Sequence, residues 1–286
     1  LNAAADAYNV GVGFKAGEAM TTGTNNVLVG SFAGDALTTG DRSVAIGHDA
    51  LSSEDTGTRN VAVGWGTLTA QNYDGAGYNT AVGYNAGNQV TTGTLNTIVG
   101  GLAGDALTEG DGNIAIGSNA LSSETTGGNS IAIGTAAMQS ATLADFNIAI
   151  GSNALQNLAQ SSLTHTHNVA VGKSAGQAMT SGKQNTLMGG GAVGSGLTTG
   201  LGNTAYGYES LATEDDADYA TAIGFQALKV QNTGTTQSYN TALGYRAGHA
   251  VSTGVNNTLL GAAAGNAITT GDNNIIIGKD AAASAV

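Results

Sequence analysis

A five-residue motif, seen cleanly at Asn113–Gly117, recurs sixteen times and constrains the fold of this chain more than any other feature. The motif always closes on glycine, and eleven of the fifteen spacings between these glycines equal that from Gly100 to Gly117. The other four spacings are longer by one to four residues, and the extra residues fall between motifs and not within them. A fixed period of this length is typical of a solenoid, in which each repeat forms one coil and stacks only on its neighbours.

The residue types within the motif predict a short β-strand. Its first position is Asn in thirteen repeats, its second is always β-branched, its third is Ala in ten, and its fifth is always Gly. β-branched residues two apart suit a strand, whereas three apolar residues before an invariant glycine are too few for a helix. We therefore predict an all-β fold, a parallel β-solenoid (β-roll) of sixteen coils.

Parallel stacking of equivalent strands, about 4.8 Å apart, places the first and last motif residues in columns. Asparagine amides in a column can hydrogen-bond to one another, as in cross-β stacks, and glycine tolerates the positive φ of a sharp corner. We predict a structural ladder, clearest at Asn79, Asn96, Asn113, Asn147, Gly83, Gly100, Gly117 and Gly151.

The second half of each repeat is more variable and often ends in Thr-Thr-Gly. It is compatible with a second short strand or with a single helical turn. Glycines such as Gly30, Gly34 and Gly40 indicate three corners in each coil.

Apolar residues occupy both faces of the motif strand, with positions two and four on one face and position three on the other. Strands that are buried on both sides have this pattern. So short a coil encloses space for one face only, and the other face therefore needs a partner. We predict a second copy of the chain as that partner, in a lengthwise parallel homo-oligomer. The alternative is a wide monomeric solenoid.

Composition agrees with this architecture and excludes several classes of protein. The chain of 286 residues has 46 glycines, no proline and no cysteine, and only 10% of its residues are charged. A net charge of −12 argues against binding to nucleic acid. No apolar run approaches the length that spans a bilayer, so we expect no membrane insertion of this segment. We expect an N-terminal extension at 1–8 and one β-solenoid domain at 9–286, as a fragment of a longer chain.

The sequence offers no catalytic, cofactor or metal site, and we predict that the chain is not an enzyme. His165 and His167 could bind a metal with a ligand from a neighbouring chain, but two polar loop residues explain them as well. The run of Glu214, Asp215, Asp216 and Asp218 is interpreted as a solvated turn.

Exposed rings are the candidates for surface contact. Aromatic residues directly follow several motif glycines, and others lie in the insertions between repeats. Loops on a rigid scaffold commonly carry binding residues, although packing between coils or chains is an alternative for the rings. The candidates are Trp65, Tyr73, Tyr84, His165, His167, Tyr208, Tyr239 and Tyr245.

The Asn-x-Ala-[Val/Ile]-Gly repeat, as at Asn60–Gly64, Asn113–Gly117 and Asn147–Gly151, resembles the head repeats of trimeric autotransporter adhesins. Those repeats form parallel β-rolls with three chains side by side. The fuller pattern, Asn79–Gly87 followed by Thr91–Gly93, looks even more like repeats of bacteriophage tail-fibre proteins. The resemblance covers nearly the whole chain and implies a homotrimer without catalytic residues. The period of this chain is longer than that of the adhesin repeats.

These observations predict a structural shaft or head segment of a phage tail fibre, located on the virion. It would hold the receptor-binding parts of the fibre away from the virion and contribute contacts to a host-surface glycan or protein receptor. The first alternative is the head of a trimeric adhesin on a bacterial surface. The second is an ice- or surface-binding solenoid that uses columns of threonine, and the third is a glycan-cleaving tailspike.

Overall fold

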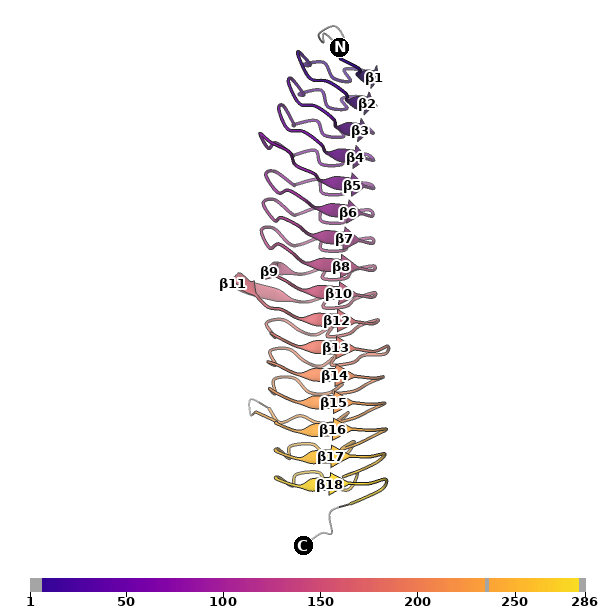
Figure 1. Ribbon diagram of the computed structural model, residues 1–286, viewed down its shortest axis with the longest axis vertical. Helices are drawn as coiled ribbons and strands as arrows, with labels where there is room; N and C mark the ends of the chain where they lie inside the picture. The colour runs from indigo at the N-terminus through magenta and orange to yellow at the C-terminus, as the bar shows by residue number, and fades with distance from the viewer. Residues whose placement is uncertain (1–6, 235–236, 283–286) are drawn as a thin grey trace. The chain divides into compact units, whose positions relative to one another are not determined.

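The computed structural model describes residues 7–234 and 237–282 and shows an all-β chain of short parallel strands (Figure 1). The described residues contain no α-helix. The chain divides into two compact units, Leu1–Asp145 with Ser161–Leu163 (unit 1) and Phe146–Gln160 with Thr164–Val286 (unit 2). Each unit is a stack of coils with one motif strand per coil, so the predicted parallel β-solenoid of sixteen coils is confirmed.

The motif strands follow one another in chain order within each unit. In unit 1 they are β1 (Val10–Val12), β2 (Val27–Val29), β3 (Val44–Ile46), β4 (Val61–Val63), β5 (Thr80–Val82), β6 (Thr97–Val99), β7 (Ile114–Ile116) and β8 (Ile131–Ile133). In unit 2 they are β10 (Ile148–Ile150), β12 (Val169–Val171), β13 (Thr186–Met188), β14 (Thr204–Tyr206), β15 (Thr221–Ile223), β16 (Thr241–Leu243), β17 (Thr258–Leu260) and β18 (Ile275–Ile277). Pairing joins equivalent motif positions, for example Ala115 with Ala132.

Two further strands depart from this pattern. β9 (Thr142–Asp145) and β11 (Ala159–His165) form a separate two-stranded sheet. β11 coincides with the longest insertion predicted between repeats, so this insertion has regular structure of its own.

At the N-terminal end, residues 1–6 of the predicted extension lie outside the described residues. Its last two residues, Ala7 and Tyr8, are described. The carbonyl of Ala7 accepts a hydrogen bond from the Asn25 amide at 2.8 Å. The end of the predicted extension therefore already stacks on the next coil.

Apart from β9 and β11, the second half of the described coils is neither a strand nor a helical turn. It is a series of turns in which the second and fourth residues after the motif glycine have positive φ, as at Asn119 (55°) and Leu121 (55°). The Asn119 amide donates to Gly101 in the preceding coil, and the Leu121 amide donates to Ala137 in the following one. The alternating backbone thus bonds each turn to both neighbouring coils.

The asparagine column is buried, and its bonds differ from the amide-to-amide bonds expected from the sequence. The side-chain oxygen of Asn96 accepts the backbone N–H of Asn113 in the next coil at 2.8 Å. Its Nδ2 donates to the carbonyl of Gly110 at 2.9 Å. Direct bonds between amides occur in unit 2, for example from Asn185 to Asn168 at 3.1 Å. Each side chain therefore connects the start of one strand to the turn before the next.

The motif glycines meet two requirements at once. Gly117 has a φ of 132°, and a Cβ placed there would lie 2.6 Å from the carbonyl oxygen of Gly134 in the next coil. Side chains are strained at such φ values and excluded at such distances. The same holds for Gly83, Gly100 and Gly151. Gly40 differs from the expected corner because it has no positive φ, and the last positive φ of its coil falls on Arg42.

The coil interior follows a rule of constant volume. Where the third motif residue is Leu28, Ile98, Leu187 or Leu259, the turn after the motif glycine carries a second Gly, in that coil and in the one before. A Cβ on Gly87 or Gly104 would lie 3.0 or 3.4 Å from the side chain of Ile98. Where the third residue is Ala115, the later position is Leu121, and both are fully buried. Leu28, Leu187 and Leu259 repeat the pattern of Ile98.

This rule predicts that a second substitution can restore stability that a first substitution removes. Ile98→Ala should lower the free energy of unfolding by about 3 kcal/mol because it opens a cavity. Adding Gly104→Leu should restore part of that loss, since Leu121 shows that leucine fits this turn with positive φ. Gly104→Leu alone should destabilise through overpacking. Denaturant unfolding measures all three variants, and a double variant no more stable than Ile98→Ala would contradict the rule.

The asparagine column predicts a second loss of stability. Asn113→Ala removes the side-chain acceptor of the Ser130 amide and the side-chain donor to the Gly127 carbonyl inside the coil, which should cost about 3 kcal/mol. Asn113→Ser is the matched control and should cost less, because the Ser43 hydroxyl already accepts the Asn60 amide at 3.3 Å. Equal unfolding free energies for Asn113→Ala and the unsubstituted chain would show that the column adds nothing to stability.

Candidate interaction surface

The outward face of the motif strands runs along the successive coils of each unit. Position three points into the coil, and positions two and four point away from it. Ala115 is 1% exposed, whereas Ile116 beside it is 36% exposed and Ile114 is half-buried. In β18 the contrast is larger, with Ile277 65% exposed and Ile276 8% exposed. The strand face that was predicted to need a partner is therefore the one formed by positions two and four.

The two units build this face from different side chains. In unit 1 it consists of valine and isoleucine except at two threonines. In unit 2 the second motif position is threonine in five successive strands, β13 to β17, which stack in register as Thr186, Thr204, Thr221, Thr241 and Thr258. The fourth position beside this row holds Met188, Tyr206, Ile223, Leu243 and Leu260. Unit 2 thus presents an uninterrupted row of hydroxyl groups next to a row of large apolar groups.

Rings that directly follow the motif glycine form the post-glycine column. In unit 1 the ring centroid of Trp65 lies 6.0 Å from that of His48 and 5.3 Å from that of Tyr84, with the rings nearly parallel. In unit 2 Phe225 lies between Tyr208 and Tyr245, 5.4 Å from each. Both faces of Trp65 and of Phe225 are covered by neighbouring rings, so these two rings offer only their edges to a ligand.

Tyr84 ends the stack of unit 1 and is 56% exposed. The next residue in the post-glycine column is Gly101, where an added Cβ would meet no atom within 4 Å. There is consequently open space beside the outer face of Tyr84, which makes this ring the one in the stack that is suited to flat contacts.

A second set of rings lies just before the first motif residue, which is asparagine except after Tyr219, and forms the pre-asparagine column. The Tyr219 and Tyr239 rings stack at 5.5 Å, and the guanidinium of Arg59 lies 5.6 Å from the centroid of Tyr78. Phe146 contacts the rings of both His165 and His167. The sequence interpretation overlooked this column, although its members share one position in the repeat.

The two histidines belong to this ring cluster. Their centroids lie 6.0 Å apart. Among residues 7–234 and 237–282, no group of three or more histidine, cysteine, aspartate or glutamate side chains is placed to hold a metal ion.

The Tyr73 ring belongs to the loop at 71–78. It lies against its own loop, since a Cβ on Gly75 would be 2.8 Å from its Cε1 atom, and it is 39% exposed. Tyr239 also follows an insertion, and its hydroxyl donates to Gln237 at 2.6 Å. Residues 235 and 236 of that insertion lie outside the described residues. The two insertions thus each present an exposed tyrosine.

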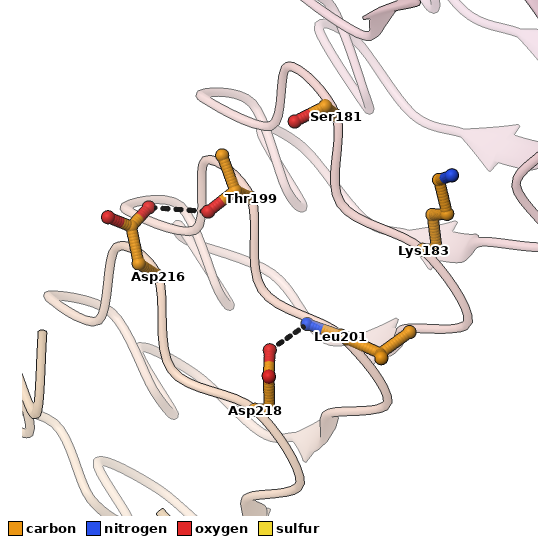
Figure 2. Close-up of a pocket in the computed structure, with 6 residues that line it drawn as sticks. All are labelled: Ser181, Lys183, Thr199, Leu201, Asp216 and Asp218. Carbon is orange, nitrogen blue, oxygen red and sulfur yellow. Dashed lines mark hydrogen bonds between the residues drawn. The ribbon is translucent and has the colours of Figure 1, made fainter. Parts of the chain in front are cut away.

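A shallow groove in unit 2 gathers polar side chains from three successive coils (Figure 2). Asp216 accepts hydrogen bonds from the hydroxyls of Thr199 and Thr198 at 2.6 and 2.7 Å, which lower the pKa of its carboxyl. Asp218 accepts the Leu201 amide at 2.7 Å. Both carboxylates of the groove are thus engaged in bonds that hold the turns.

Glu214, from the same acidic run, corrects the interpretation of that run as a solvated turn. Its side chain is fully buried, and burial raises the pKa of its carboxyl. It accepts hydrogen bonds from the Gln231 side chain at 2.9 Å and from the Ala217 amide at 3.2 Å.

Comparison of the chain with models of known protein families, with curated proteins and with solved structures found no match. In the part of the chain that the structure describes, no helix is long and apolar enough to cross a membrane. The fold therefore defines the class of this protein, a parallel β-solenoid with one short strand per coil.

The ring stack predicts a fluorescence response, because Trp65 is the one tryptophan of the chain. Tyr84→Ala should uncover one face of Trp65, raise quenching of its fluorescence by acrylamide and cost about 1 kcal/mol of stability. Tyr78→Ala removes an exposed ring of the other column and is the matched control, for which we expect unchanged quenching. Unchanged quenching in Tyr84→Ala would contradict the stack.

Proposed function

We propose that this chain is a structural segment of a homotrimeric fibre, in which the outward strand face forms the lengthwise interface between chains. The observation that carries the proposal is the exposure of a row of mainly apolar position-four residues along each unit. Position-four residues such as Ile46, Val82 and Ile116 are 36–37% exposed in the single chain. Apolar surfaces that extend over many residues mark interaction sites in soluble proteins.

The geometry of this face favours a second copy of the chain as the partner. Its apolar rows repeat with the spacing of parallel strands, about 4.8 Å. A partner that fills these rows over eight coils needs the same spacing, and a copy of the chain has it. Closed symmetric assembly then covers the face in every copy. The resemblance to tail-fibre and adhesin repeats supports three chains.

Within such an assembly the chain would serve as the shaft or head of a phage tail fibre on the virion. The rigid stack of coils would hold the parts that reach the host away from the virion. No enzymatic activity is proposed. Contacts with a host-surface glycan or protein would fall to exposed rings with an open face, such as Tyr84, and to the loop tyrosines. A trimeric adhesin head on a bacterial surface would use the same interface.

The threonine row of β13 to β17 favours a second candidate, an ice- or surface-binding solenoid. Five threonines in register along one face give a periodic array of hydroxyl groups. Thr186, Thr241 and Thr258 are exposed in the single chain. This candidate needs the face to be free in solution, whereas the fibre needs it to be covered.

Light scattering on the native particle separates the two candidates. We expect three chain masses of 27.9 kDa for the fibre segment. One chain mass would overturn the trimer, and inhibition of ice growth by such a monomer would support the second candidate.

A pair of substitutions tests which face forms the interface. Ile116→Asp should leave the coils folded and shift the particle toward smaller masses, because it places an unpaired charge in the contact between chains. Ala115→Asp is the matched control, one residue away on the inward face, and should disrupt the coil itself, as circular dichroism would show. A folded trimer of unchanged mass with Ile116→Asp would place the interface on another face.

A further inference from the structure

Three glutamates are buried inside the coils at one shared position of the repeat. Glu54, Glu124 and Glu214 are each fully buried. Each lies one coil after a buried leucine at the same position, namely Leu37, Leu107 and Leu197. Ionisable side chains are rarely buried in this way unless polar groups compensate them, so the same exception at three places calls for a common reason.

The partners of these carboxylates supply that reason. Glu54 accepts the amide of Gly57 in its own turn at 2.7 Å and that of Tyr73 in the next coil at 3.5 Å. Glu124 accepts the Gly127 amide at 2.8 Å in its own turn. It also accepts the amides of Leu143 and Ala144 in the next coil, at 2.9 and 3.1 Å.

Glu214 repeats the arrangement in unit 2. It accepts the Ala217 amide in its own turn and the Thr233 amide in the next coil, at 3.2 and 3.3 Å. Each carboxylate therefore joins its own turn to the backbone of the coil that follows.

The coil that follows each glutamate departs from the usual turn. Two extra residues lie in the loop 71–78 after Glu54, the strand β9 follows Glu124, and three extra residues precede Tyr239 after Glu214. In an ordinary coil the amide at this point donates to a carbonyl of the next coil, as Glu109 does to Thr125 at 3.2 Å. A loop that leaves the stack loses such acceptors, and its inward amides need others.

We propose that Glu54, Glu124 and Glu214 are positioning residues, which hold the departing loops in place by accepting their backbone N–H groups. The proposal depends on neither the trimer nor the nature of a receptor, because all of these contacts lie within single chains. For Glu54 the consequence is functional, since its loop presents Tyr73 and Tyr78, which are 39% and 52% exposed.

Glu54 also makes its loop sensitive to pH. Burial raises the pKa of its carboxyl to about 7, with a smaller contribution from Asp55 on the same turn. The loop brings a further acid, Asp74, whose carboxylate accepts the Thr56 hydroxyl at 2.7 Å. The residues at the same coil position on either side, Leu37 and Gln71, carry no charge.

The direction of the pH effect follows from linkage. Opening of the loop exposes Glu54 and returns its pKa toward the ordinary 4.5, so opening releases a proton. The closed loop is thus most stable below pH 4.5 and loses stability as pH rises to about 7. The equilibrium constant for opening should increase on the order of a hundredfold across this window.

Amide hydrogen exchange on the full chain tests the proposal. Glu54→Leu removes the acceptor and restores the residue that Leu37 places in the adjacent coil. We expect exchange at the Tyr73 amide to accelerate about tenfold while the coils stay folded, as the loss of a hydrogen bond to a buried backbone group implies. Glu54→Gln keeps an acceptor oxygen without a charge and should retain protection. Glu124→Leu is the matched control and should leave Tyr73 unaffected.

The pH profile distinguishes positioning by the ionisable Glu54 carboxyl group from simple filling of space. Measured against Glu54→Gln at each pH, the unsubstituted chain should show faster exchange at Tyr73 as pH rises from 4.5 to 7. Unchanged protection of Tyr73 in a folded Glu54→Leu variant would overturn the proposal. Identical pH profiles for the unsubstituted chain and Glu54→Gln would also overturn it.

Discussion

The hydrogen bonds of the buried asparagine column are the interaction on which this architecture depends. Each amide oxygen fixes the backbone N–H that begins the next strand, and each amide nitrogen fixes the carbonyl of a later turn, as Asn113 does for Ser130 and Gly127. A coil without asparagine needs a substitute. Where Ala220 stands at this position, the Ser238 hydroxyl accepts the Asn240 amide at 3.1 Å. The bond persists although the residue that supplies it has changed.

Axial stacking sets demands on the remaining positions of the coil. The motif glycines approach so closely from coil to coil that a side chain would collide with the next carbonyl. The turns alternate between ordinary and left-handed backbone, so that their amides point to both neighbours in turn. Leucines such as Leu121 accept a positive φ there because a buried side chain fills the interior. Local backbone strain is thus compensated by packing and by axial hydrogen bonds. It recurs along the chain because each turn has the same arrangement.

Two kinds of surface remain once these demands are met. The outward strand face is regular and apolar, which suits a partner with the same period. The loops after Glu54 and Glu214 are irregular and present tyrosines, which suits contacts that differ from place to place. The stacked rings of the post-glycine column are intermediate in regularity between these two kinds of surface. Their faces are used within the chain, so they strengthen the stack and leave its end, at Tyr84, open.

The sequence by itself determined the strand, its parallel register and the number of coils, because a strict repeat permits each coil only one kind of neighbour. It also indicated that one strand face lacks a partner. Only the tertiary structure decided which face that is. A three-residue strand with apolar side chains on both faces does not indicate which face points into the coil. The structure likewise showed that the asparagines bond to backbone groups, that Glu214 is buried, and that Trp65 is covered by rings from adjacent coils. Those properties depend on which atoms of successive coils meet, and a regular repeat places the coils side by side without orienting their side chains.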